Sequence, residues 1–410
     1  MGESRQSSRV IFSRVLFMFA CFACCLTAQA QPAGGPEITS RLQRAAALIA
    51  ARDLAGAESE IATALRAAPG EARALNLLGV VRAQQGRAPE AEDCFRRALA
   101  AGPRLAGARV NLGLLYQGQD RLDEAAAEFA AALDLEPRRE DATAGLVGVL
   151  RRQAALAAGD REKALSYLLR AKAVAPADAD VLFEFGMTAL GLGLNEDAGR
   201  ALAAAYERRP DEPRFVYALA RARLAVSALA EAVALFERYV ALRPEDATGH
   251  YGLGYALALL RRTAEAAPAF RRSIELQPEQ TESPYQLGLL AYAEGDVDGA
   301  AGWYEKVLAR RADHAGARLG MGLVYFRRRQ YDQARESLER AAALDPTLAK
   351  AHYHLGLTYA RLGESEKAAR EADLAARLER EQKEQRRVIL RLLEGEPETP
   401  APPAGSPRPD

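Results

Sequence analysis

The side chains in this sequence that could carry chemistry are few and do not form a catalytic pattern. The chain of 410 residues has four histidines, which are His250, His314, His352 and His354. His352 and His354 are two residues apart, so on a helix they diverge and cannot bind one metal ion as an i, i+4 pair would. No nucleophile elbow, phosphate-binding loop or zinc-spaced cluster of cysteine and histidine appears. We therefore expect no enzyme activity, no cofactor and no metal site.

The charged side chains do not indicate nucleic-acid binding. Residues 1–30 carry three arginines and one glutamate, and without them the chain has 52 basic and 54 acidic side chains, a net charge of −2. Acids and bases alternate along the sequence, for instance in residues 379–387. A nucleic-acid binder would show a basic patch or stripe instead.

The most regular feature of the sequence is a 34-residue repeat, marked by proline and by an alanine twelve residues before it. The repeated prolines are Pro69, Pro103, Pro137, Pro176, Pro210, Pro244, Pro278 and Pro346. Within each period, apolar residues recur at helical spacing in two blocks, and the proline ends the second block. A fixed period of this length is typical of a solenoid of stacked helical repeats.

Small residues recur where the two helices of a repeat would come close together. Glycine occupies the eighth position in seven repeats, for example Gly79 and Gly113. Glycine inside a helix costs about 0.5–1 kcal/mol relative to alanine, so its repeated use indicates a contact where a side chain would not fit. We expect the repeated alanine of the second helix, such as Ala91, to face this glycine.

This pattern closely resembles the tetratricopeptide repeat family, which has Leu-Gly, then Tyr or Leu, then Ala, Phe or Leu, Ala and Pro at the same spacing. The resemblance implies an all-α fold, a right-handed α-solenoid superhelix of tandem helix-turn-helix repeats. The ten units are Ile38–Glu71, Ala72–Leu105, Ala106–Arg139, Glu140–Asp178, Ala179–Glu212, Pro213–Asp246, Ala247–Gln280, Thr281–His314, Ala315–Leu348 and Ala349–Gln382. The unit 140–178 is five residues longer, which predicts a first helix with about one extra turn. Arg44 stands where the core leucine of the first unit belongs, as in a terminal repeat that faces solvent.

The first 30 residues have the three parts of a secretory signal peptide. Three arginines form a positive start, residues 15–26 form an apolar run, and Ala28-Gln29-Ala30 form a small-residue cleavage site. The apolar run is shorter than the about 20 residues of a membrane-spanning helix. We expect cleavage after Ala30 and a periplasmic or secreted protein with no membrane span.

Two alternatives to cleavage stay open. Cys21, Cys24 and Cys25 lie in the apolar run, so the chain could be a membrane-anchored lipoprotein, although the residues before them are bulkier than a lipobox usually has. The segment could also stay as an uncleaved anchor. After cleavage Cys94 is the only cysteine, and an internal disulfide is excluded.

The remaining parts of the chain flank the repeats. Residues 31–37 form a linker, residues 383–394 extend the last helix as a cap, and residues 395–410 are rich in proline and predicted to be disordered. Val388, Ile389, Leu392 and Leu393 form an apolar stripe, which we expect to fold back on the last repeat. The alternative is a helix for a partner or for self-association, whereas the expected state is a monomer.

The resemblance implies that positions two, five, six, nine and twelve of each unit line a concave groove. The groove residues predicted in this way are Asn76, Asn111, Phe183, Tyr217, Tyr251, Tyr255, Tyr285, Tyr292, Phe326 and Tyr353. The groove would be polar and aliphatic in the early units and aromatic in the later ones. Aromatic side chains combine a large contact area with a polar tip, which suits peptide or protein capture. The alternative interpretation is that tyrosine at position five only supports packing.

These expectations together favour an exported scaffold or adaptor that binds a protein or peptide partner and organises an assembly at the cell envelope. The abundance of alanine, arginine and glycine is typical of a bacterial protein. The alternatives are a chaperone-like carrier of exported chains and a regulatory subunit of a separate envelope enzyme.

Overall fold

The structure is a computed structural model that describes residues 35–394, with side chains described as far as Glu384. Residues 1–30, for which the sequence predicts a signal peptide, residues 31–34 of the predicted linker and residues 395–410 lie outside the described residues. The side chains of the apolar stripe Val388, Ile389, Leu392 and Leu393 lie outside them too.

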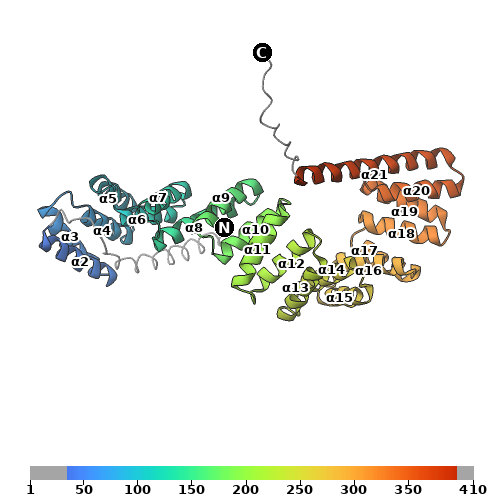
Figure 1. The fold of residues 1–410 in the computed structure, drawn as a ribbon, viewed down its shortest axis with the longest axis horizontal. Helices are drawn as coiled ribbons and strands as arrows, with labels where there is room; N and C mark the ends of the chain where they lie inside the picture. The colour runs from blue at the N-terminus through green and yellow to red at the C-terminus, as the bar shows by residue number, and fades with distance from the viewer. Residues whose placement is uncertain (1–34, 395–410) are drawn as a thin grey trace, which may run out of the picture. The chain divides into compact units, whose positions relative to one another are not determined.

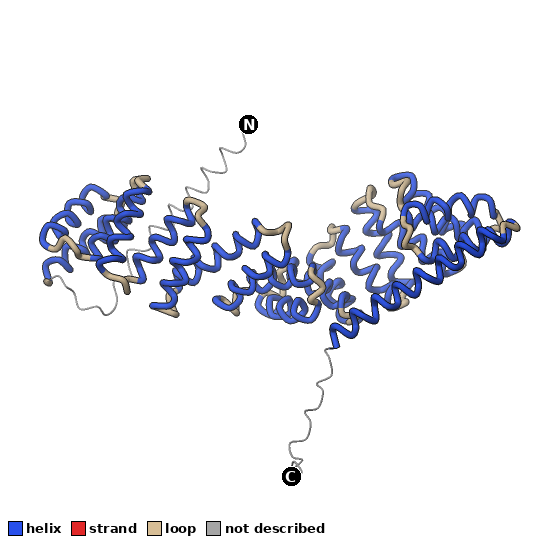
Figure 2. The backbone as a smooth tube through the Cα atoms, turned by 90° about the horizontal axis from the view of Figure 1, so that it is seen from above, coloured by secondary structure: helices blue, strands red, loops and turns tan. Residues whose placement is uncertain are grey.

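The described residues form twenty helices joined by short loops, with no strand among them (Figures 1 and 2). The all-α fold expected from the sequence is therefore confirmed. The chain divides into two compact units, which meet between Pro210 and Asp211. The first unit holds α2 (Pro36–Ala50), α3 (Leu54–Ala67), α4 (Ala72–Gln84), α5 (Ala88–Ala101), α6 (Ala106–Gly118), α7 (Leu122–Leu135), α8 (Glu140–Leu156), α9 (Arg161–Val174), α10 (Ala179–Gly191) and α11 (Asn195–Arg208).

The second unit continues the same alternation of helices. It holds α12 (Pro213–Ala225), α13 (Leu229–Leu242), α14 (Ala247–Leu259), α15 (Thr263–Leu276), α16 (Glu282–Glu294), α17 (Val297–Arg310), α18 (Ala315–Arg327), α19 (Tyr331–Leu344), α20 (Ala349–Leu362) and α21 (Ser365–Glu394). Each repeat thus contributes a first helix with an even number and a second helix with an odd number. The first helix usually has 13 residues, whereas α8 of the long fourth repeat has 17, which is about one extra turn.

The first helices lie on the inner side of each unit. In the first unit α2 contacts α4, α4 contacts α6 and α6 contacts α8; in the second unit each first helix from α12 to α20 contacts the next. Successive second helices make weaker contacts or none. Because the first helices approach one another more closely, each array curves with its first helices on the concave side, as the family resemblance implies.

The nearest neighbour of the glycine at the eighth position is a large side chain of the second helix in six repeats, which the sequence prediction did not include. The repeated alanine that it named also faces the glycine in two repeats, where the carbonyl oxygens of Ala198 and Ala368 lie 3.2 Å from a Cβ atom built at Gly186 and Gly356. In the six repeats a Cβ atom at the glycine would come within 2.5–3.0 Å of a side chain four residues after the alanine. The pairs are Gly79 with Phe95, Gly113 with Phe129, Gly186 with Leu202, Gly254 with Phe270, Gly288 with Tyr304, and Gly322 with Leu338. In the last repeat Gly356 instead faces the backbone of Ala368. The glycine therefore makes room for an inserted ring or leucine.

Two of these rings lie between a pair of glycines from neighbouring repeats. Tyr304 contacts Gly288 of its own repeat and Gly320 of the next, and a Cβ atom at either glycine would be 2.5 Å from the ring. Phe129 lies in the same way between Gly113 and Gly145. Each ring thereby joins two successive repeats.

Substitution of Gly320 by alanine is expected to lower the free energy of unfolding by about 1–3 kcal/mol, because the buried Tyr304 ring has no room to move away. Gly302 lies inside α17 with no atom within 4 Å of a Cβ, so Gly302→Ala should raise it by about 0.5–1 kcal/mol. Urea unfolding followed by circular dichroism measures both variants. Equal effects of the two substitutions would contradict the packing account.

The last helix begins as the second helix of the tenth repeat and continues beyond it. Ala375 and Leu378 of α21 are buried. Further along the helix, the Gln382 side chain donates a hydrogen bond to the Thr347 carbonyl. The α-helix extends to Glu394. The first part of α21 therefore anchors the helix on the array.

Candidate protein-binding surface

The tyrosines at position five of the second unit are largely occupied with packing. Tyr217 contacts the rings of Phe236 and Tyr239 on α13 with centroids 5.8 and 5.0 Å away. Tyr251 packs 5.9 Å from Phe270 in the same manner. Burial raises the pKa of the Tyr217 and Tyr251 phenols above their ordinary value, so both stay neutral at physiological pH.

Tyr285 follows the same pattern on α16. Its ring lies 6.2 Å from Tyr304 and 4.8 Å from His314, and its hydroxyl group is close to Gly316 of the next repeat. Burial raises its pKa as well. Because Tyr217, Tyr251 and Tyr285 are half-buried, a partner could contact only part of each ring. Their removal would also weaken the core.

The apolar surface that is open on the concave side lies mostly at position nine. The exposed fractions are 36% for Tyr255, 38% for Leu289, 37% for Leu357 and 49% for Tyr353 at position five of the same helix. These four residues come from α14, α16 and α20, and we call them the concave strip. Sequence reasoning named Tyr255 and Tyr353 but missed Leu289 and Leu357. The 34-residue spacing of Tyr255, Leu289, Leu323 and Leu357 was the signal that could have found them.

On α18, between these helices, the surface is formed differently. Leu323 at position nine is only 5% exposed and packs in a cluster that includes Tyr292 and Phe326. The Arg327 guanidinium lies 4.5 Å from the centroid of the Tyr292 ring, a cation–π contact. The predicted groove residues Tyr292 and Phe326 therefore pack together with the buried Leu323 on α18.

The predicted polar residues of the first unit contact each other. The Asn111 side-chain amide donates a hydrogen bond of 3.0 Å to the Asn76 carbonyl oxygen, and Asn111 is only 8% exposed. Phe183 lies half-buried on α10. Arg151 and Glu184 form an ion pair of 2.5 Å on neighbouring first helices. These polar side chains on the inner face of the first unit are therefore paired with one another.

His352 and Cys94, two side chains with catalytic potential, are engaged in structure. Both ring nitrogens of the buried His352 are bonded, one to Glu371 at 2.7 Å and one to the Pro346 carbonyl at 3.1 Å. Cys94 is buried, and burial raises the pKa of its thiol, which disfavours the reactive thiolate. Within residues 35–394 no group of three histidine, cysteine or acidic side chains could hold a metal ion.

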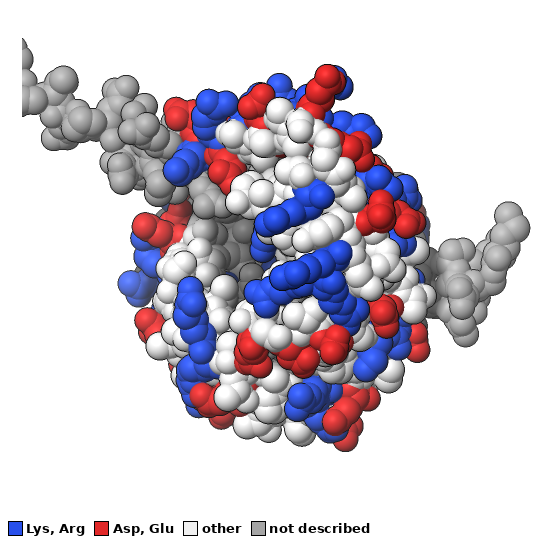
Figure 3. Space-filling model, turned by 90° about the vertical axis from the view of Figure 1, so that its right-hand side faces the viewer, with Lys and Arg blue, Asp and Glu red and all other residues white. Residues whose placement is uncertain are grey.

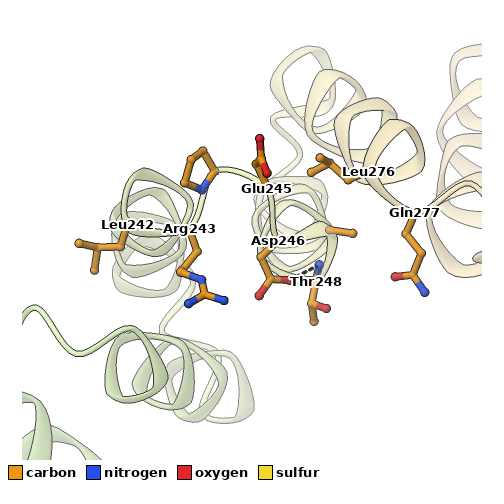
Figure 4. A pocket seen from close by; sticks show the side chains of 9 residues that line it. Leu242, Arg243, Glu245, Asp246, Thr248, Leu276 and Gln277 are labelled. Atoms are coloured by element: carbon orange, nitrogen blue, oxygen red, sulfur yellow. Dashed lines mark hydrogen bonds between the residues drawn. The ribbon is translucent and has the colours of Figure 1, made fainter.

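A further open pocket of about 650 Å³ lies where the α13–α14 loop meets the end of α15 (Figure 4). Two acidic residues line it, Glu245 and Asp246, and Asp246 accepts hydrogen bonds from the Tyr239 hydroxyl and from the Thr248 backbone N–H. Asp246 therefore caps α14, and the pocket presents no chemistry beyond that of an ordinary loop.

Acidic and basic side chains are interspersed on the face shown in Figure 3, with uncharged surface between them. Many are paired, as Arg335 is with Glu364 at 3.4 Å. None of the helices in the described part of the chain has the length and apolar character needed to cross a membrane.

His314, beside Tyr285, should make the second unit less stable in acid. Its Nδ1 accepts the Ala317 N–H at 3.0 Å and so caps α18, which a protonated nitrogen cannot do. Burial and the nearby Arg311 lower the pKa of His314 below its ordinary value of 6.5, against smaller opposite effects of its acidic neighbours. Its contribution is thus complete above pH 6.5 and lost as the pH falls through the lower folded-state pKa.

The matched variant is His314→Asn, since asparagine caps helices without titrating in this range. The free energy of unfolding should fall less for the variant than for the parent chain between about pH 7 and pH 5. Urea titrations at each pH measure the difference. Burial also lowers the pKa of His354, which is present in both proteins and cancels in the comparison. Identical losses in both proteins would refute the role of His314.

Comparison with known protein families supports the repeat assignment. Sequence models described as tetratricopeptide repeat match residues 42–106, 183–247, 217–281 and 261–315, residues 291–340, and residues 106–139 and 349–382. A model described as TPR repeat matches residues 322–363. The matches leave out residues 140–182, which contain the long fourth repeat. None of these models describes a catalytic family.

Solved structures of repeat proteins resemble the chain only in part. YrrB, described as a TPR protein with an unusual peptide-binding site, is 24% identical, with 45% of this chain and 95% of YrrB covered and a TM-score of 0.38. MamA from Desulfovibrio magneticus RS-1 is 25% identical, with 42% and 96% covered and a TM-score of 0.38. The Cut9–Hcn1 structure of the APC/C is 15% identical, with 83% and 81% covered and a TM-score of 0.48. No curated protein matches the chain.

Proposed function

Since this chain belongs to the tetratricopeptide repeat family, a family of protein-interaction scaffolds, we propose that it is an exported, non-catalytic scaffold whose concave strip binds an extended segment of a protein partner. The observation that carries the proposal is the exposure of Tyr255, Leu289, Tyr353 and Leu357 on the inner helices of one unit. Contiguous exposed apolar surface rimmed by polar residues is typical of a protein-binding site.

The arrangement of the strip supports binding of an extended segment. The four residues lie along the array on α14, α16 and α20, and on α18 between them Leu323 is buried, so a chain that crosses the helices can contact the strip on either side of α18. Aromatic and leucine side chains supply apolar contact area, and Arg327 beside Tyr292 adds a charged group at the edge. The strip lacks a charged group at its centre, so shape and apolar contact would dominate recognition.

A library of random twelve-residue peptides displayed on phage tests this proposal, with selection on the chain with and without residues 395–410. Peptides rich in apolar residues should be enriched, and binding should disappear when Leu289 and Leu357 are replaced by aspartate. Failure to select any peptide on either form, or selection of peptides indifferent to these substitutions, would overturn it. One consensus would favour a scaffold with a dedicated partner, and broad weak binding would favour the carrier.

The proposal places the protein at the cell envelope, as part of an assembly in the periplasm or outside the cell. Its support is the signal-peptide pattern of residues 1–30. The expected mature amino terminus is Gln31, and mass spectrometry of the protein purified from its native cells measures it. A lipid-modified cysteine or an intact Met1 start would contradict cleavage after Ala30 and favour an anchored form.

A further inference from the structure

We propose that the concave strip takes a proline-rich segment of this same chain, residues 395–410, as an internal ligand that competes with partners. The inference rests on the proposed function, because it concerns the same four residues. Four properties of the chain support it: the spacing of the prolines, the spacing of the helices, the length of the segment and its charge.

The segment has proline at a three-residue spacing. Six of the twenty prolines of the chain lie in its sixteen residues, and Pro397, Pro400 and Pro403 are three residues apart. Polyproline II helices have three residues per turn and a rise of about 3.1 Å per residue. In that conformation these three prolines would share one edge and recur about every 9 Å.

The concave strip repeats at a matching distance. The first helices α14, α16, α18 and α20 contact one another in sequence, and packed helices are about 8–10 Å apart. Tyr255, Leu289 and Leu357 hold the same position on these helices. One polyproline turn therefore advances about one helix. Prolines one turn apart match Tyr255 on α14 and Leu289 on α16, and prolines two turns apart match Leu289 and Leu357 on α20, because Leu323 on the α18 helix between them is buried. Grooves lined by aromatic residues bind polyproline segments in this manner.

The segment starts close enough to reach the strip. It follows α21, which Leu378 and Gln382 anchor at α20 and at the loop that leads into it, and α20 carries Tyr353 and Leu357. The twelve residues of α21 after Gln382 extend about 18 Å. Sixteen extended residues span about 50 Å, so the segment can turn back across the array. Attachment to the same chain gives it an effective concentration that a separate partner would need millimolar amounts to equal.

Charge also favours this occupant. Residues 395–410 contain three acidic residues and one arginine. Lys350 lies exposed on α20, three residues before Tyr353, and the exposed Arg327 lies at the end of α18. An acidic segment would approach these cations favourably at the α18–α20 part of the strip, whereas the exposed Glu282 at the start of α16 carries the opposite charge.

A labelled peptide with the sequence of residues 395–410 tests the inference by fluorescence anisotropy. It should bind the chain that ends at Glu394, which retains every described residue, and bind the full chain at least about ten-fold more weakly because the tethered segment competes. Binding should be lost with the peptide in which Pro397, Pro400 and Pro403 are alanine. It should also be lost with Leu289→Ser and Leu357→Ser in the chain, but not with Leu169→Ser on the exposed face of α9.

Three results would overturn the inference. They are no binding to the chain that ends at Glu394, equal binding to both forms, and binding indifferent to the strip substitutions. Light scattering should show the full chain as a monomer, and a dimer that needs residues 395–410 would assign the segment to a second copy and overturn the internal contact. If library peptides bind the strip while this peptide does not, the inference fails and the proposed function stands.

Discussion

Replacement of Phe129 by alanine is expected to lower the free energy of unfolding of the first unit by about 3–5 kcal/mol, the usual cost of removing a buried aromatic ring. Phe129 is fully buried, and its ring lies between Gly113 of its own repeat and Gly145 of the next. Because a solenoid is held together by contacts between neighbours, the loss affects both repeats at once. The effect should therefore concentrate in α6, α7 and α8.

Hydrogen exchange measured by mass spectrometry locates the effect, and urea unfolding gives its size. The matched control is Phe129→Leu, since Leu202 and Leu338 occupy the equivalent position in other repeats. Leucine should cost about 1 kcal/mol, because it fills most of the space. Unchanged exchange in α6–α8 of the alanine variant would show that the ring does not join the repeats.

Aspartate at both Leu289 and Leu357 is expected to weaken binding of a selected peptide by about 100-fold or more. Truncation of a central contact residue often costs at least about 2 kcal/mol, and 1.4 kcal/mol corresponds to ten-fold in affinity. An aspartate that becomes buried under the peptide adds a desolvation cost. The free protein should keep its stability, because both leucines are more than one third exposed.

Aspartate at Leu169 is the matched control for this pair. Leu169 is 56% exposed on α9, a second helix of the first unit, so the variant adds the same charge away from the concave strip. Isothermal titration calorimetry measures the affinity of each variant, and thermal unfolding measures its stability. Equal loss of affinity at Leu169 would mean that added charge, and not the strip, governs binding.

The arrangement of the helices could be predicted from the sequence because the same repeat occurs ten times. Proline ends the second helices, and the extra residues of the fourth repeat lengthen α8 as expected. The sequence prediction placed the repeated alanine at the eighth-position glycine but did not include the larger side chain that lies closer in six repeats, because periodicity alone gives which residues share a face but not how far a side chain reaches. Phe129 and Tyr304 reach across to two repeats, whereas the alanine is too short to fill that space.

The candidate site follows from the sequence less completely. Position five, one of the groove positions that the family resemblance implies, carries a ladder of tyrosines, yet the rings of Tyr217, Tyr251 and Tyr285 turn toward neighbouring helices and pack there. The exposed leucines Leu289 and Leu357 share their residue type with the core, so composition could not distinguish them. The side chains of adjacent repeats decide which of two apolar positions on one helix face stays exposed to solvent.

Site-specific photocrosslinking in intact cells tests the central claim most directly, namely that the concave strip binds protein segments. A benzoylphenylalanine replaces Tyr353, an exposed ring of the strip, or Leu169 as the control, and mass spectrometry identifies the crosslinked peptides. We predict crosslinks to protein segments from position 353 and none above background from position 169. Crosslinks of equal yield from both positions, or none from position 353, would contradict the account.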